Sequence, residues 1–137
     1  MKARRLLTSL LASACLLVAG QSLAHDNGPG VDFIQPKNGD TVAQTFAVKF
    51  AVKGMKIAPA GDMSADTGHH HLLIDTADIA EGTVIPMDDR HRHFGKGQTE
   101  TEITLAPGRH RLTLQFADGA HRSYGERFRE TIEITVK

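Results

Sequence analysis

Apolar and polar residues alternate along several short stretches of this sequence, the pattern of β-strands with one buried face. The clearest stretch is residues 46–52, where Phe and Val occupy every second position. The same alternation, or a short apolar run, recurs in six further segments: residues 31–35, 69–75, 83–85, 98–105, 110–116 and 128–136. Turn-forming sequences separate several of them, and no long amphipathic helix is evident. The pattern therefore predicts an all-β fold, specifically an antiparallel immunoglobulin-like β-sandwich.

The first 24 residues differ in kind from the rest. Lys2, Arg4 and Arg5 form a positive start, and residues 6–19 are an apolar run that is short for a membrane span. Small residues before position 25 then predict a cleavable signal peptide, with cleavage after Ala24. Residues 25–137 would form one periplasmic or secreted domain that has no membrane span after cleavage. Two alternatives remain open, an uncleaved anchor and a lipoprotein modified at Cys15.

Composition narrows the function classes. Removal of the leader takes away three basic residues and no acidic ones, which leaves 13 Lys and Arg against 16 Asp and Glu. A domain with this small acidic excess has no basic surplus for nucleic acid, so we expect no nucleic-acid partner. Cys15 is the only cysteine and lies in the predicted leader. We therefore expect the mature domain to have no disulfide and no thiolate metal ligand.

Histidines supply the candidate chemistry, and all eight follow the predicted leader. Residues two apart in an extended chain point to the same side, so His69 with His71 forms one pair and His91 with His93 another. If the two segments are neighbours, three or four imidazoles could share one ion. Imidazole ligands suit Zn(II), Cu(II) and Ni(II). The alternative is that these rings only hydrogen-bond the backbone.

The other histidines separate by position. His70 shares its face with Leu72 and Ile74, which favours a core position, and His110 precedes an apolar row that predicts a hydrogen-bonded histidine at a sandwich corner. His121, beside an Asp-Gly turn, is a further candidate ligand. After cleavage, His25 would pair its imidazole with a free amino group in a chelate suited to Cu(II). The candidate metal ligands are therefore His69, His71, His91, His93, His121 and His25.

Two strings in the chain carry a family resemblance. Residues 69–75 read HHHLLID and residues 93–100 read HFGKGQTE, followed by PGRH at 107–110. With these motifs the chain resembles the bacterial family DUF4399, a domain of unknown function, from about residue 46 to the end. The resemblance implies a short exported protein with a compact domain. It implies no activity and no ligand set, and His25 lies outside the region that it covers.

Three functions remain in view at this stage. The first is a non-enzymatic periplasmic domain that binds a divalent transition metal, copper or zinc, through clustered histidines. The second is an interaction module for an envelope protein or glycan, with structural histidines. The third is a metal-dependent hydrolase, for which the sequence offers no evident general base.

Overall fold

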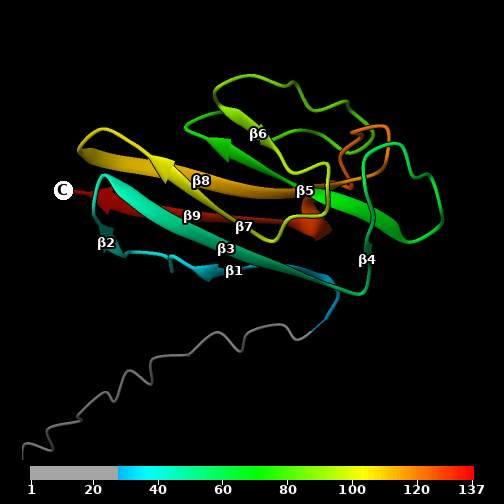
Figure 1. Cartoon of the computed structure of the whole chain (residues 1–137), viewed down its shortest axis with the longest axis horizontal. Helices are drawn as coiled ribbons and strands as arrows, with labels where there is room; N and C mark the ends of the chain where they lie inside the picture. The colour runs from blue at the N-terminus through cyan, green and yellow to red at the C-terminus, as the bar shows by residue number, and fades with distance from the viewer. Residues whose placement is uncertain (1–27) are drawn as a thin grey trace, which may run out of the picture.

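The computed structural model describes residues 28–137, so the predicted leader and His25 lie outside the described residues. In this part of the chain, nine strands form two sheets (Figure 1). The smaller sheet has the order β1-β3-β7, and its strands are β1 (Gly30–Gln35), β3 (Thr45–Lys53) and β7 (Glu100–Thr104). None of the described residues forms a helix that is long and apolar enough to cross a membrane.

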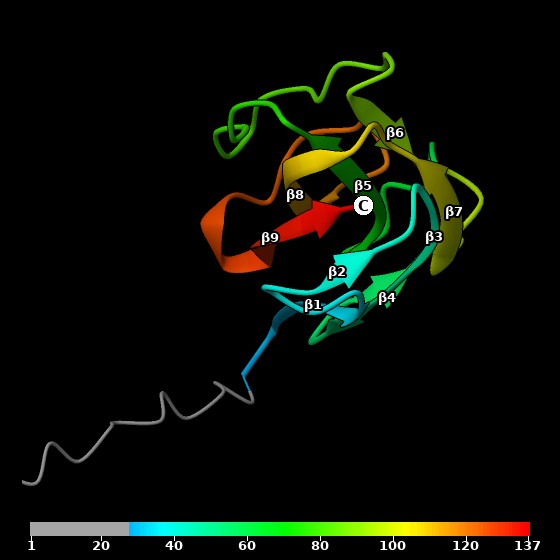
Figure 2. The same ribbon diagram turned by 90° about the vertical axis from the view of Figure 1, so that its left-hand side faces the viewer.

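The larger sheet has the order β2-β9-β8-β5-β4, and β6 also pairs with β5. Its strands are β2 (Thr41–Val42), β9 (Arg129–Val136), β8 (Gly108–Ala117), β5 (Thr67–Ile74), β4 (Lys56–Ile57) and β6 (His91–His93). A single 3-10 turn, η1 (Glu126–Phe128), precedes β9. The two sheets lie face to face (Figure 2), and apolar side chains from both form one continuous core. The predicted all-β sandwich is confirmed.

Three details differ from the sequence prediction. Residues 91–93, which are not among the segments predicted as strands, form strand β6 because each of them pairs with a residue of β5. Residues 83–85, expected to be a strand, make only an isolated bridge between Val84 and Arg122. Most strand pairs are antiparallel, but β2 with β9 and β4 with β5 are short parallel pairs.

Strand β5 is buried along its whole length. Its inner face contributes His70, Leu72 and Ile74 to the sandwich, and its outer face presents His69, His71 and Leu73. Leu73 packs with Ile85 and Ala117 in a small second apolar cluster. The outer face of this central strand is therefore enclosed by other parts of the chain and not open to solvent.

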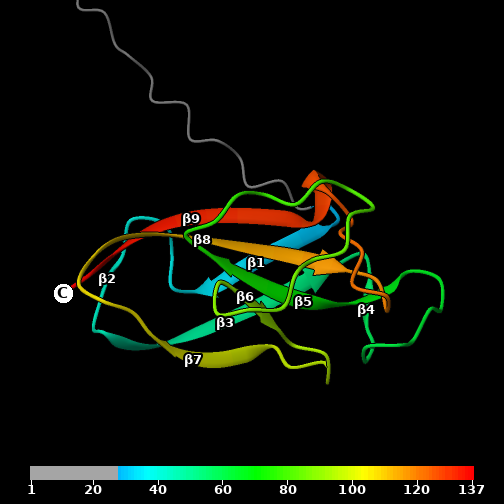
Figure 3. The same cartoon turned by 90° about the horizontal axis from the view of Figure 1, so that it is seen from above.

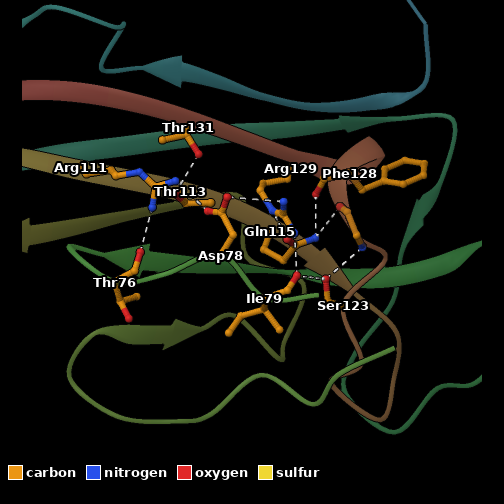
Figure 4. A network of polar contacts seen from close by, with 11 residues as sticks. Thr76, Asp78, Ile79, Arg111, Thr113, Gln115, Ser123, Phe128, Arg129 and Thr131 are labelled. Carbon is orange, nitrogen blue, oxygen red and sulfur yellow. Dashed lines mark hydrogen bonds and ion pairs between the residues drawn. The ribbon is translucent and has the colours of Figure 1, made fainter. Parts of the chain in front are cut away.

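A polar network fastens the segment after β5 to the neighbouring strands (Figure 4). Arg129 donates hydrogen bonds to the side-chain oxygen of Gln115 at 2.9 Å and to the carbonyl of Ile79 at 2.6 Å. Arg111 donates to the carbonyl of Thr76 and to the carboxylate of Asp78, both at 2.8 Å. These bonds hold residues 76–79 over the outer face of β8 and β9, which helps to cover the same face of β5.

Candidate metal centre

Four histidines meet at one point on the outer face of the larger sheet. They are His69, His71, His93 and His121, and one ring nitrogen from each lies within 4.8 Å of all the others. His69 and His71 are fully buried, whereas His93 and His121 are partly exposed. The cluster thus has two ligand candidates below the surface and two at its edge.

Strand pairing places the first three rings. His69 and His71 stand two apart on β5, so they share a face. Strands β5 and β6 are neighbours (Figure 3), and His71 of β5 is the direct cross-strand partner of His93 of β6. The centroids of these two rings are 5.1 Å apart. Opposed residues of an antiparallel pair bring their Cβ atoms to about 4.5–5.5 Å. The register alone therefore brings these three imidazoles together.

A turn after β8 supplies the fourth ring. Asp118 Oδ1 accepts the backbone N–H groups of Ala120 and Arg122, both at 2.9 Å, and its Oδ2 accepts Arg122 Nε at 2.9 Å. His121 lies between these anchors with φ 64°, a left-handed conformation that a residue with a bulky side chain rarely adopts. The turn fixed by Asp118 thus holds the His121 ring against His69.

Small residues allow the surrounding chain to close on the cluster. A Cβ at Gly95 would collide with the His93 ring and lie 2.6 Å from its Nε2. A Cβ at Gly119 would meet the backbone of Asp62. Ala60 and Gly61 donate backbone hydrogen bonds to the carbonyls of Gly95 and Gly119, each at 2.8 Å. The segment around residue 60 therefore ties the loop that follows β6 to the turn that carries His121.

The contacts of one nitrogen exceed what hydrogen bonding can explain. His69 Nε2 lies 3.1 Å from Nε2 of His71, 3.1 Å from Nε2 of His93 and 3.1 Å from Nδ1 of His121. An imidazole nitrogen carries either one proton or one lone pair, so it makes one good in-plane hydrogen bond. An ion between the four nitrogens would account for all three contacts together.

The protonation states also suit metal binding. Burial, together with repulsion from the neighbouring histidines, lowers the pKa of His71 to about 2. Burial, followed by the charges of His93 and His121, lowers the pKa of His69 to about 4, although Asp118 opposes this. Burial and His121 also lower the pKa of His93. These rings are neutral at pH 7, and a neutral ring has the lone pair that a metal requires.

In the two buried rings, the nitrogen that faces away from the cluster lacks a hydrogen-bond partner among the described residues. Nδ1 of His69 and Nδ1 of His71 are buried and have no hydrogen-bond partner among the described residues. Metal-bound histidines usually donate their second N–H to a carboxylate or carbonyl. Here strand packing, and not a hydrogen bond at Nδ1, sets the orientation of these two rings.

One predicted ligand needs a correction. His91 lies on the same face as His93, but its cross-strand partner is Leu73, one pair beyond His71. Its Nδ1 donates to Asp88 Oδ1 at 2.7 Å, and its backbone N–H donates to the same oxygen at 3.0 Å. His91 is thus outside the group of four. His121, which the sequence analysis gave as a further candidate ligand, occupies the fourth position, although no local spacing in the sequence pairs it with the other three.

The two histidines assigned to structural positions lie as expected. His70 is fully buried, with its ring 4.7 Å from that of Phe50 and 4.9 Å from that of Phe116 by centroids. His110 donates to Asp75 Oδ2 at 2.6 Å and to the carbonyl of Ala106 at 2.7 Å. The hydrogen bond to Asp75 raises the pKa of His110, because both ring nitrogens face acceptors and the charged form satisfies both.

Comparisons with known proteins add a family but no activity. A search of curated proteins finds no match to the chain. Among solved structures, it is similar to the endo-beta-1,4-mannanase from Thermotoga petrophila, with 16% identity over 87% of this chain and 21% of that one, at a TM-score of 0.48. The chain spans about a fifth of the length of that protein. The DUF4399 profile, a domain of unknown function, matches residues 48–137, so the chain belongs to that family.

Proposed function

We propose that this protein is an exported, non-enzymatic domain of the periplasm that binds one divalent transition metal ion, copper or zinc. The ligands are His69, His71, His93 and His121. The observation that carries the proposal is the set of three 3.1 Å contacts made by His69 Nε2.

The chemistry of the cluster supports this assignment. Four imidazoles provide borderline donors, which bind zinc and copper well and bind calcium or magnesium poorly. The rings come from β5, β6 and the turn after β8, so a bound ion would join three separate parts of the chain. A ligand set built across a fold in this way gains its affinity only in the folded protein.

The proposed export rests on the leader sequence alone and is independent of the metal centre. Residues 1–24 have the three-part pattern of a signal peptide. The intact mass of the exported protein should match a chain that starts at His25. A chain that starts elsewhere would remove the His25 chelate, and a lipid mass on Cys15 would change the proposed location.

The test is the metal content of protein secreted with its own leader and purified without a His tag. We expect elemental mass spectrometry to find close to one equivalent of zinc or copper per chain. The double variant His71→Ala with His93→Ala should contain no bound metal. If the double variant unfolds, His93→Ala alone provides the same test. His91→Ala is the matched control, because it removes a histidine of the same strand that lies outside the cluster. Folded wild-type protein that binds neither ion would leave the interaction module as the better function.

A further inference from the structure

The arrangement of the four nitrogens distinguishes between kinds of metal ion. His69 Nε2 is equidistant, at 3.1 Å, from the other three ligand atoms. In a tetrahedron with metal–nitrogen bonds of 2.0–2.1 Å, every nitrogen is about 3.3–3.4 Å from the other three. In a square plane, two neighbours lie at about 2.8–3.0 Å and the opposite nitrogen at about 4.0–4.2 Å. One nitrogen with three equal neighbours fits the tetrahedron and not the plane.

The spacing of the four rings supports the same geometry. All six distances between ring centroids in the cluster fall between 4.7 and 5.7 Å. Three rings present Nε2 and the fourth presents Nδ1. No two rings therefore lie on opposite sides of the centre, as the trans ligands of a square plane do.

The surrounding chain resists flattening of the site. Gly95 packs directly against the His93 ring, the His71–His93 register is fixed by strand pairing, and Asp118 holds the His121 turn. Movement of one ring into a plane with the others would require displacement of a strand or of this turn.

We infer that the centre is a closed tetrahedral zinc(II) site, in which four protein nitrogens fill all coordination positions. This inference rests on the proposed function and narrows it from copper or zinc to one ion. Zn(II) has no geometric preference from its d electrons and is commonly tetrahedral in proteins, whereas Cu(II) and Ni(II) with nitrogen ligands favour square-planar or tetragonal sites. Cu(I) tolerates a tetrahedron but prefers sulfur, and the cluster contains none.

A closed site also has consequences for chemistry. A catalytic zinc site keeps a position for water or substrate, and a structural one does not. With four imidazoles around the ion, exogenous anions have no position to occupy. The site would therefore hold zinc without activating water, which agrees with a non-enzymatic domain.

The test uses Co(II) as a spectroscopic substitute for zinc in the metal-free protein. We expect one equivalent of Co(II) to give the intense visible bands of a tetrahedral complex, and added azide to leave them unchanged. Zn(II) should displace the Co(II) and should bind at least tenfold more tightly than Ni(II). In His121→Ala the fourth position opens, so azide should now shift the bands, while His91→Ala should behave as the wild type.

Three results would overturn the inference while metal binding itself stands. These are weak, octahedral-type Co(II) bands, an azide response in the wild type, and a preference for Ni(II), or for Cu(I) under reducing conditions, over Zn(II). Absence of binding by all of these ions would instead refute the proposed function, and the inference with it.

Discussion

On the outer face of β5, the rings of His69 and His71 converge with two histidine rings from other segments. On the inner face of the same strand, His70 lies between two phenylalanine rings. The three β5 histidines, His69, His70 and His71, are all fully buried, and burial is the chief cause that lowers the pKa of each. The outer rings have other nitrogens at 3.1 Å, but neither nitrogen of His70 has a partner among the described residues. The same residue type thus forms a candidate ligand set on one face and an unsatisfied core residue on the other.

This difference shows that burial alone does not identify a functional histidine. A low pKa is common to His69, His70 and His71 and so cannot distinguish them. Convergence does distinguish them, because an ion needs several lone pairs directed at one point. Four variants can break or sharpen this comparison, and they are taken in order of expected effect.

The largest effect should come from removal of two ligands. In wild-type protein, zinc at a thousand times its Kd should stabilise the fold by about 4 kcal/mol, which raises the melting temperature by about 10–20 °C for a domain of this size. His71→Ala with His93→Ala should abolish this rise, because only His69 and His121 remain. Calorimetric melts with zinc and with EDTA measure it. A rise of the same size in the double variant would place the ion elsewhere.

The second effect concerns the packing of the outer face. Gly95→Ala introduces a Cβ that collides with the His93 ring, so we expect zinc affinity to fall about 10- to 100-fold, the size typical of lost ligand support. Gly30→Ala is the control, since its Cβ would make only an ordinary 3.4 Å contact with a backbone oxygen away from the cluster. Titration calorimetry compares the two. Unchanged affinity in Gly95→Ala would mean that His93 does not depend on this contact.

The third effect concerns the inner face and pH. Burial lowers the pKa of His70 from 6.5 to about 4, so the unfolded state binds a proton at higher pH than the folded state. The stability associated with a neutral His70 is complete above pH 6.5 and is lost as the pH falls towards 4. His70→Leu removes this loss, and at pH 5 the variant should be more stable than wild type by about 2 kcal/mol. Urea unfolding of the metal-free proteins at pH 5 and pH 7.5 measures it.

Metal binding provides the internal control for that variant. His70→Leu should bind zinc as the wild type does, because the side chain points away from the cluster. An equal stability difference at both pH values would show that packing, and not protonation, separates the two proteins.

The smallest effect should come from the corner histidine. The hydrogen bond to Asp75 raises the pKa of His110, so the stability that charged His110 contributes is complete below pH 6.5 and is lost as the pH rises through the folded pKa. The side chain of Asp75 is 40% exposed, and solvent screening limits the expected loss in His110→Ala to about 1 kcal/mol. Urea unfolding of both proteins across this pH range should show that the difference in unfolding free energy shrinks as the pH rises. Impaired zinc binding in this variant would assign the corner to the metal centre.

Local pattern was sufficient for much of the fold and for half of the site. Alternation over residues 46–52 and 110–116 predicted strands with one buried face, because side-chain direction in a strand has a period of two. The same rule placed His69 and His71 on one face of β5 and His70 on the other. These assignments depend only on neighbours along the chain.

Tertiary structure decided which other histidines complete the site. His91 and His93 look equivalent in the sequence, but the register with β5 sets His93 opposite His71 and moves His91 one pair away, where Asp88 binds it. His121 enters the cluster through a turn that Asp118 holds in place after β8. Strand register and the packing of distant loops depend on contacts across the whole fold, whereas a spacing rule describes only one segment. The sequence alone therefore determined most of the strands and the β5 pair, and the folded structure determined strand β6 and the four-nitrogen centre.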